Sequence, residues 1–146
     1  MQSETTQGNE IDLVIPILPD MEITAGYVAE AVATRMAFDD EESGDVKLAL
    51  IEACINAFEH SQSTDRQVFI KFVIESDRMK VTIADHGRGF DPSQVPRPEI
   101  AAKMGKASRK RGWGLLLIER LMDSVEIVST AHGTTLTMTK RKQESR

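Results

Sequence analysis

The sequence predicts an α+β two-layer sandwich, in which a mixed, mostly antiparallel sheet has its helices packed on one face. One observation is the order of strand-like and helix-like segments, β-α-α-β-β-α-β-β, which contains two pairs of consecutive strands. The other is the length of 146 residues, which suffices for one hydrophobic core and is too short for two domains. We therefore expect a single domain over residues 11–140, between tails at 1–10 and 141–146.

The N-terminal part of the chain predicts an edge strand followed by a helix. The run IDLVIPILP, which begins at residue 11, is typical of a strand. Pro16 places this strand at an edge, because proline cannot donate a hydrogen bond to a neighbouring strand. Asp20 is the expected N-cap of a helix that ends near Phe38. The spacing of its apolar residues predicts a buried face made of Ile23, Tyr27, Val28, Ala31 and Val32.

A strongly acidic run comes next. We expect the run DDEESGD, at 39–45, to form a solvated loop, and a second helix to begin at Gly44 and Asp45 and to end near Ser61. Residues 1–60 hold 13 acidic and two basic side chains, whereas residues 61–146 hold 10 acidic and 16 basic ones. The distribution of charge indicates how a protein associates with others more than how it folds. The acidic half is therefore a candidate surface for a partner.

The second half predicts two hairpins on either side of a long loop and a helix. The runs QVFIKFVIES and MKVTIADHG are separated only by Asp77 and Arg78, as in an antiparallel hairpin. Residues 91–111 contain three of the five prolines and a short helix at 98–104, and they are expected to form a long loop of the functional lid kind. The run GLLLIERLMDS predicts a helix that begins at a glycine, and VEIVST, HG and TTLTMTKR form the last hairpin.

Composition excludes several kinds of protein. Cys54 is the only cysteine, so neither a disulfide framework nor a cysteine-rich zinc site can form, and its apolar neighbours predict a core position. No apolar run is long enough to span a membrane, and the N-terminus lacks the basic and apolar pattern of a signal peptide. We therefore expect a soluble cytoplasmic protein with no membrane partner.

A basic group on the expected loop raises the alternative of nucleic-acid binding. The group consists of Lys103, Lys106, Arg109, Lys110 and Arg111. Binding of this kind predicts an affinity that falls steeply with salt. The net charge of −5, the isoelectric point of about 5.2 and the lack of interleaved aromatic residues argue against it. We therefore expect no direct nucleic-acid partner.

The stretch EACINAFEH, at 52–60, places polar side chains on an otherwise apolar helix. Four of them fall at helical spacing and so share one face, namely Glu52, Asn56, Glu59 and His60. A buried carboxylate without a partner is costly, which leaves two interpretations: a satisfied hydrogen-bond network, or a site that holds water or Mg²⁺. Mg²⁺ on a nucleotide takes only one or two protein oxygens. The Asn56 carbonyl is therefore a candidate ligand, and Glu52, one turn earlier, is a candidate base.

A glycine motif before the last helix favours the second interpretation. RGWGLLLIE, at 111–119, places Gly112 and Gly114 at the expected start of that helix. Free N–H groups and the helix dipole favour an anion such as a phosphate there, and Arg111 adds positive charge. The motif therefore predicts a phosphate site.

A second glycine motif follows a buried strand. In DHGRGFD, at 85–91, the Asp85 carboxylate can accept a hydrogen bond from the exocyclic amine of adenine. Gly87 and Gly89 leave room for the flat base, because glycine has no Cβ. Together the two motifs predict a nucleotide with its base at Asp85 and its phosphates at Gly112.

Other nucleotide-binding patterns are absent. The nearest approach to a P-loop, GKAS at 105–108, lacks both the upstream glycine and a hydroxyl residue after the lysine. The chain contains neither H-R-D nor D-F-G, and GRGF is not followed by the third glycine of a dinucleotide fingerprint. The expected nucleotide site therefore belongs to another scaffold.

In their order the motifs resemble those of the GHKL ATPases, which share the Bergerat fold, also called the histidine-kinase-like ATPase fold. EACINAFEH resembles the N box of that family, DHGRGF its first glycine box, RGWGLLLIERLMD its second and HGTTLTM its closing Gly-Thr element. The four motifs span most of residues 46–139. The small size and the patterns E-x-x-x-N-A-x-x-H and D-x-G-x-G-F-D most resemble the anti-sigma-factor serine/threonine-protein kinases of bacterial partner-switching systems.

The resemblance implies a role for each motif residue. Glu52 is implied as the catalytic base, Asn56 as the Mg²⁺ ligand and the segment 91–111 as the ATP lid. The residues implied around the adenine are Asp85, Gly87, Gly89 and either Thr134 or Thr135, and those around the phosphates are Gly112 and Gly114.

The resemblance also implies a function and partners. It implies a kinase that uses ATP and Mg²⁺ to phosphorylate a small antagonist protein of the anti-anti-sigma type, and that binds a sigma factor in another state. It further implies a homodimer, for which the expected edge strand is a candidate pairing site. The alternative is a regulatory switch domain that binds ATP and acts by protein contact without phosphoryl transfer. The intact Glu52 argues against this alternative, because a pure binder needs no base.

Overall fold

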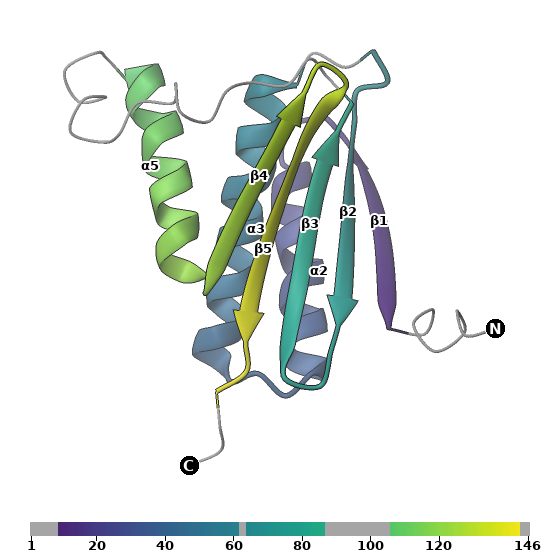
Figure 1. The fold of residues 1–146 in the computed structure, drawn as a ribbon, viewed down its shortest axis with the longest axis vertical. Coiled ribbons are helices and arrows are strands. Elements are labelled where there is room, and N and C mark those ends of the chain that lie inside the picture. The colour runs from purple at the N-terminus through teal and green to yellow at the C-terminus, as the bar shows by residue number, and fades with distance from the viewer. Residues whose placement is uncertain (1–8, 62–63, 87–105, 144–146) are drawn as a thin grey trace.

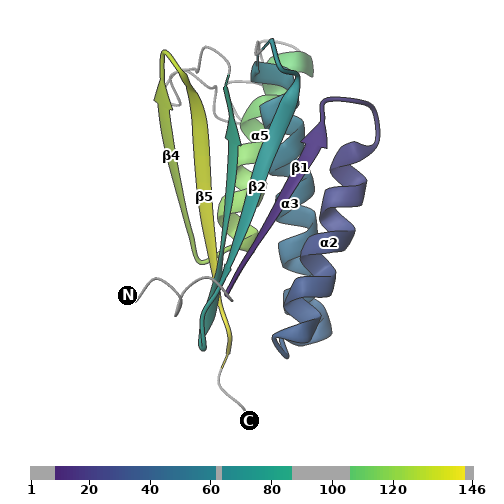
Figure 2. The ribbon, with the colours of Figure 1, turned by 90° about the vertical axis from the view of Figure 1, so that its right-hand side faces the viewer.

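The computed structural model describes residues 9–61, 64–86 and 106–143, which form one layer of strands and one layer of helices (Figures 1 and 2). The strands are β1 (Glu10–Pro16), β2 (Gln67–Ile74), β3 (Arg78–Asp85), β4 (Ser124–Thr130) and β5 (Gly133–Arg141). The helices α2 (Met21–Arg35), α3 (Asp40–His60) and α5 (Lys106–Leu121) cover one face of the sheet. The predicted α+β two-layer sandwich is therefore confirmed.

The strands follow the order β1-β2-β3-β5-β4, and every pair of neighbours in the described residues is antiparallel. The sheet is thus antiparallel throughout rather than mixed. Both predicted hairpins are present, as β2–β3 and β4–β5. β1 is an edge strand as predicted, with Pro16 opposite Gln67.

Alternation along each strand gives the sheet a buried face and an open face. In β2 and β3 every second residue is buried against the helices. The core side chains from these two strands are Val68, Ile70, Phe72, Met79, Val81 and Ile83. Cys54 of α3 is fully buried in the same core, as predicted. The sheet and α3 therefore hold each other in place through side chains from both layers.

Helix α2 differs from the prediction in its cap, its end and its buried face. The Asp20 side chain does not cap the helix, because the Asp20 backbone is left-handed, with φ 72°. The helix ends at Arg35, before Phe38. Its buried residues are Ala25, Gly26, Ala29, Val32 and Ala33. Of the predicted face only Val32 is buried, whereas Ile23 is 40% and Tyr27 58% exposed.

The small side chains of α2 are buried because this helix lies very close to α3. A Cβ added to Gly26 would lie 2.7 Å from Cγ1 of Ile51 and 3.3 Å from Cγ of Lys47. Larger apolar residues on α2 have no room at this contact and lie on its flanks. The apolar spacing of α2 therefore identified a helix but not the face that it buries.

The acidic run is the start of α3 rather than a solvated loop. Asp39 is the N-cap: its Oδ1 accepts a hydrogen bond of 2.7 Å from the Glu42 backbone N–H, and its own N–H donates to Glu42 Oε1 at 2.9 Å. Asp40, Glu41 and Glu42 occupy the first turn, where negative charge is stabilised by the helix dipole. The prediction of a helix start at Gly44 was therefore wrong, because the capping box was interpreted as charge alone.

Helix α5 begins at Lys106, earlier than the glycine at which the sequence predicted its start. The preceding residues include Lys, Ala and Arg, which favour helix, and no proline separates them from the glycines. The last part of the predicted lid, 106–111, is therefore helical. The short helix expected at 98–104 lies outside the described residues, as do 1–8 and 144–146 of the predicted tails, so the domain limits stay predictions. Within the described residues, no helix is long and apolar enough to cross a lipid bilayer.

Candidate active site

A small cavity lies at the end of the sheet where β3 stops and β5 starts, next to α3 (upper end of Figure 1). Asp85, the last residue of β3, pairs with Thr134 of β5. The cavity is lined by Ala53, Asn56, Ala57, Ile83, Asp85, Ile127, Thr134 and Leu136. Most of this lining is apolar, and three polar side chains share it, as in many sites for small molecules. Its volume of about 10 Å³ is that of a single water, so a larger ligand requires the surrounding groups to move apart.

The two most polar of these groups are almost fully buried. Asp85 is 6% exposed because the alternation of β3 turns it toward the helices, and Asn56 is 7% exposed because it lies on the inner face of α3. Among the described residues, no hydrogen bond engages the Asn56 side-chain amide. The amide atoms of Asn56 are not among the side-chain atoms that are cut off from solvent without a partner, so they line the cavity as polar groups that water or a ligand can reach.

Glu52 and Gly114 meet where α3 packs against α5. A Cβ added to Gly114 would lie 3.2 Å from Oε1 of Glu52, so the absence of a side chain leaves the space next to this carboxylate. Glu52 is half-buried and lies one turn before Asn56 on the same helix. The structure therefore brings the predicted base next to the second glycine motif, although 62 residues of sequence separate them.

Gly133 is a residue of the site that the sequence analysis did not single out. Its backbone has φ +142°, and a Cβ there would lie 2.0 Å from the carbonyl oxygen of Asp85. Only glycine fits such an approach of two backbones. The available signal was the glycine directly before the two threonines in HGTT, which we placed in the last hairpin and in the closing Gly-Thr element without giving Gly133 a role of its own. Gly133 lets β5 pair closely with the end of β3 at Asp85.

The two candidate threonines of β5 lie on opposite faces of the sheet. Thr134 is buried, lines the cavity, and shares a hydrogen bond of 2.9 Å with the Ser129 hydroxyl. Thr135 lies opposite Ala84 and Val128 on the open face. Of the two, Thr134 is therefore the one that can contact a ligand in this cavity.

The predicted phosphate residues are placed differently from expectation. Gly112 and Gly114 lie inside α5 rather than at its first turn, so their N–H groups belong to the helix instead of being free. Arg111 is in the same helix, and its side chain lies outside the described part. Gly87, Gly89 and the stretch 91–105 also lie outside the described residues. The expectation of a helix N-terminus at Gly112 was thus wrong for this structure.

The residues at the cavity can hold Mg²⁺ only if nucleotide phosphates supply most of its ligands. Within the described ranges, no three side chains of His, Cys, Asp or Glu gather closely enough to hold a metal ion. Mg²⁺ that is bound with a nucleotide takes most of its ligands from phosphates and water. The Asn56 carbonyl, which lines the cavity, can supply the one protein oxygen that this mode needs.

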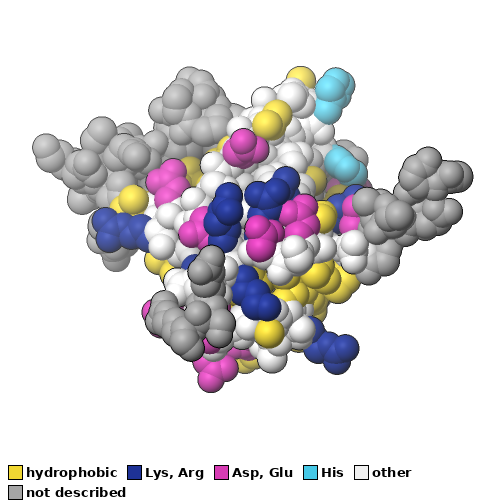
Figure 3. Space-filling model, turned by 60° about the horizontal axis from the view of Figure 1, so that its bottom comes forward, with side chains coloured by type: hydrophobic (Ala, Val, Ile, Leu, Met, Phe, Trp, Pro, Cys, Tyr) yellow, Lys and Arg dark blue, Asp and Glu magenta, His cyan; other side chains and the backbone are white. Residues whose placement is uncertain are grey.

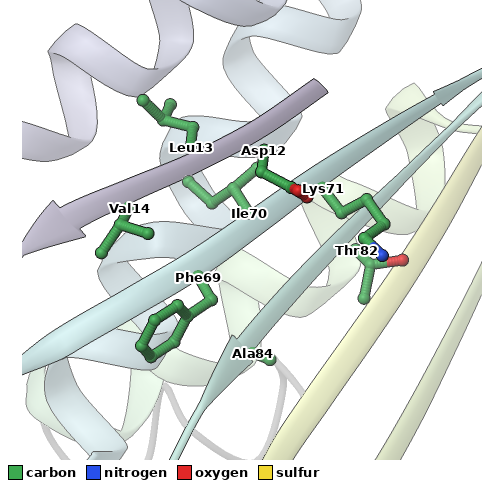
Figure 4. A pocket seen from close by; sticks show the side chains of 8 residues that line it. All are labelled: Asp12, Leu13, Val14, Phe69, Ile70, Lys71, Thr82 and Ala84. Atoms are coloured by element: carbon green, nitrogen blue, oxygen red, sulfur yellow. The ribbon is translucent and has the colours of Figure 1, made fainter. Parts of the chain in front are cut away.

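Two larger hollows lie on the open face of the sheet and lack these features. The first, across β1, β2 and β3, is lined by Asp12, Leu13, Val14, Phe69, Ile70, Lys71, Thr82 and Ala84 (Figure 4). The second, at the lower end, is lined by Arg78, Lys80, Asp123, Ser124, Glu126, Thr137, Thr139 and Arg141. Both signs of charge intermix on the surface seen from that end (Figure 3). Neither hollow is lined by a glycine whose backbone N–H could bind a phosphate.

Comparison with known sequences gives a family and named relatives. Residues 15–140 match the family described as the histidine kinase-like ATPase domain. The serine-protein kinase RsbW of Bacillus pumilus is 34% identical over 137 residues, which cover 89% of this chain and 84% of that protein. The serine-protein kinase RsbW of Bacillus subtilis is 33% identical over 135 residues, with the same coverage.

Comparison with solved structures gives the same fold. The RsbU and RsbW domains of a Mycobacterium tuberculosis protein match with a TM-score of 0.68 and 19% identity, over 94% of this chain and 34% of that one. The SiaB–SiaC complex of Pseudomonas aeruginosa contains a chain that matches with a TM-score of 0.60 and 16% identity, over 97% of this chain and 95% of that one.

Proposed function

The chain belongs to the histidine kinase-like ATPase domain family, and from this premise we propose that it is an ATP-dependent serine/threonine-protein kinase of a partner-switching system. It phosphorylates a small antagonist protein of the anti-anti-sigma type and itself acts as an anti-sigma factor. The observation that carries the proposal is the cavity shared by Asp85, Asn56 and Thr134, with Glu52 on the same helix as Asn56. Relatives named serine-protein kinases support it, since they match 89% of the chain.

In this proposal the adenine of ATP binds at the cavity. The Asp85 carboxylate accepts a hydrogen bond from the exocyclic amine, and the Thr134 hydroxyl lies at the same end. The apolar lining contributed by Ile83 and Leu136 contacts the base. Because Asp85 is buried, its hydrogen bond to the amine forms in a low-dielectric environment and discriminates strongly against a base that lacks the amine.

Phosphoryl transfer then depends on Asn56 and Glu52. The Asn56 carbonyl holds Mg²⁺, which supplies positive charge to the phosphates. Glu52 orients the hydroxyl of the acceptor protein and removes its proton, as a general base within reach of the phosphate end. Most of the rate in such a reaction comes from positioning and charge neutralisation, which fits the few chemical groups that the site contains.

Phosphate binding by the second glycine motif requires a change in α5. Gly112 and Gly114 lie within this helix, where backbone N–H groups are engaged in helical hydrogen bonds. We propose that the turns before Gly112 open when ATP binds, so that these N–H groups and Arg111 contact the phosphates. Glycine at both positions lowers the cost of that opening, since glycine favours helix less than other residues except proline.

The partners follow from the same proposal. The acceptor is a protein, and a similar fold in the SiaB–SiaC complex is found together with a second protein. We propose a homodimer that uses β1, because this strand is an open edge and exposes 39% of Ile11 and 48% of Val14. The cytoplasmic location and the absence of a nucleic-acid partner stay predictions, and His60 is given no role in the proposal.

Glu52→Gln tests the function directly. We expect the variant to bind ATP with Mg²⁺ as tightly as the wild type and to lose phosphoryl transfer by about 10²–10⁴-fold, which is the usual contribution of a general base. Titration calorimetry measures the binding, and labelled-phosphate transfer to small antagonist proteins of the same genome measures the activity. Glu41→Gln is the matched control, since Glu41 is exposed in the first turn of the same helix.

The outcomes separate the rival functions. Binding by both proteins with transfer by the wild type alone supports a kinase with Glu52 as base. Equal transfer by both removes Glu52 from that role. Binding by both with no transfer to any antagonist favours a switch that acts by contact. No ATP binding by the wild type overturns the nucleotide site itself.

A further inference from the structure

The residue after Asp85 makes contacts that the proposed reaction does not use. His86 lies on the open side of the sheet at the end of β3, and its ring contacts two residues from other segments, Asp65 and Phe69. We infer that His86 and Asp65 form a positioning pair that sets the Asp85 carboxylate for recognition of the adenine amine. This inference rests on the proposed function, because it assigns the pair to the same nucleotide site.

The first contact joins the end of β3 to the segment before β2. His86 Nδ1 lies 2.9 Å from Asp65 Oδ2, and since a carboxylate only accepts, the imidazole Nδ1–H is the donor. The other carboxylate oxygen, Oδ1, accepts a hydrogen bond of 3.2 Å from the backbone N–H of Gln67. Asp65 is therefore held at the start of β2 and provides a fixed partner for the imidazole.

The second contact is between the rings of His86 and Phe69. The centroids of the Phe69 and His86 rings are 4.6 Å apart, with an angle of 32° between the planes. Phe69 pairs with Ala84 across β2 and β3, and both side chains lie on the open face, as Figure 4 shows. The ring of His86 is thus held by a hydrogen bond at one atom and a ring contact on one side, which restricts its rotation.

The backbone at Asp85 is held from the other side by β5. Asp85 pairs with Thr134, and Gly133 allows β5 to pack directly against the Asp85 carbonyl. Successive residues of a strand point to opposite faces, so a restraint on His86 from the open face also restrains the direction of the Asp85 side chain in the cavity. β2 and β5 together therefore fix the terminal residue of β3, where the chain leaves the sheet.

The exposed fractions of the His86 and Asp65 side chains argue that the pair is not there to stabilise the fold. The His86 side chain is 58% exposed and that of Asp65 35% exposed. Pairs as exposed as this contribute little to the free energy of unfolding. We therefore expect the loss of the pair to change the geometry of the Asp85 carboxylate far more than the stability of the fold.

The experiment compares two purine nucleotides on the full chain. ATP carries the exocyclic amine that Asp85 accepts from, whereas inosine triphosphate carries an oxygen in its place. We expect His86→Ala and Asp65→Ala each to weaken ATP binding by about three- to tenfold, the usual effect of one hydrogen bond, with little change for inosine triphosphate. The preference for ATP then falls by the same factor, KM for ATP rises, and kcat at saturating ATP stays within twofold of the wild type.

Three further variants test whether the two side chains act together, whether an amide can replace the imidazole, and whether the effect is specific to His86. The double variant is expected to lose no more than either single variant, because the two side chains act as one unit. His86→Asn places an amide N–H where Nδ1 lies and is expected to restore part of the preference for ATP. His132→Ala is the matched control, since His132 is an exposed histidine in the β4–β5 turn and its backbone N–H, not its side chain, donates to the Thr130 hydroxyl at 3.1 Å.

Each result supports or overturns one statement. A wild type that does not prefer ATP overturns the proposed adenine role of Asp85, whatever the variants do. A wild type that prefers ATP, with His86→Ala and Asp65→Ala keeping that preference, overturns the positioning pair. Equal losses for both nucleotides together with a lower melting temperature also overturn it, because they indicate a structural role. If His86→Ala does not fold, Asp65→Ala, with its melting temperature measured beside its nucleotide preference, gives the same decision.

Discussion

At the scale of single residues, the contact between Gly114 and Glu52 connects two motifs that are distant in sequence. A Cβ added to Gly114 would lie 3.2 Å from Glu52 Oε1. At this distance either the Glu52 carboxylate or the α5 backbone must shift slightly. Alanine also favours helix over glycine by roughly 1 kcal/mol. The first effect moves the carboxylate, whereas the second stabilises α5 and so also raises the cost of the opening that we propose for ATP binding.

Gly114→Ala is therefore expected to reduce transfer without reducing stability. The displaced carboxylate should lower kcat about tenfold or more, because small errors in the position of a catalytic group are costly. The melting temperature should stay the same or rise. Gly44→Ala in α3 is the control, because nothing lies within 4 Å of a Cβ there, and it should raise stability and leave transfer unchanged. An unchanged kcat in Gly114→Ala would show that Glu52 does not need this space.

Cys54 gives a second prediction at this scale. Burial, with a smaller contribution from the charge of Glu22, raises the pKa of the Cys54 thiol from 9.0 to about 12. Above pH 9 the thiol of the unfolded chain ionises while that of the folded chain stays protonated, so the free energy of unfolding falls as the pH rises toward 12. Below pH 9 the thiol has no effect on this pH dependence. Denaturant titrations between pH 8 and 11 should show a smaller decline in Cys54→Ala than in the wild type.

At the scale of elements, the strands were more predictable than the helices. Short strand-like runs and the brief turns between them gave all five strands, and in β2 and β3 the buried residues follow the period of two that a sheet imposes. The helices were recognised, but α3 and α5 both begin earlier than predicted. In α3 the capping pattern of Asp39 and Glu42 was readable. In α5 the helix continues through two glycines, which local propensity alone does not decide.

Only those residues of the site that belong to a sequence motif could be predicted. Glu52, Asn56 and Asp85 could be named from helical spacing and from a strand end, and the structure places Asn56 and Asp85 in one cavity. Gly133 and His86 could not be named in this way, because their contacts depend on which strand pairs with β3 and on which loop lies beside it. Such contacts are set by the order of the strands and not by any local pattern.

The capping box of α3 gives the prediction at this scale. Asp39→Ala removes the acceptor of the Glu42 N–H and should lower the free energy of unfolding by about 1 kcal/mol, within a range of 0.5–2. Asp40→Ala is the control, since Asp40 lies one residue later in the first turn and is not the cap. Chemical denaturation measures both. Equal losses in the two variants would indicate that the charge of the first turn, rather than the cap, stabilises the helix.

At the scale of the whole molecule, the two ends of the sheet have different roles. The end with Asp85 and Thr134 holds the cavity, whereas the opposite end, lower in Figure 1, joins β5 to both α3 and α5. There the Lys140 ammonium donates to the carbonyl of Leu121 at 2.7 Å and to Asp45 Oδ2 at 3.3 Å. Its side chain is only 13% exposed. A cation at the last carbonyl groups of α5 also interacts favourably with the helix dipole.

Lys140→Met should therefore destabilise the fold while sparing the site. It keeps most of the apolar stem but leaves the Leu121 carbonyl and Asp45 without this donor, which should cost about 1–3 kcal/mol. Lys71→Met makes the same change at an open pair, where Lys71 and Glu10 lie 3.6 Å apart and are 49% and 36% exposed, and should change stability by about 0.5 kcal/mol or less. ATP affinity, measured on folded protein, should stay within twofold in both variants, because core contacts such as Ile118 continue to hold α5. A loss of affinity in Lys140→Met alone would show instead that the lower end of α5 controls the position of Gly114 beside Glu52.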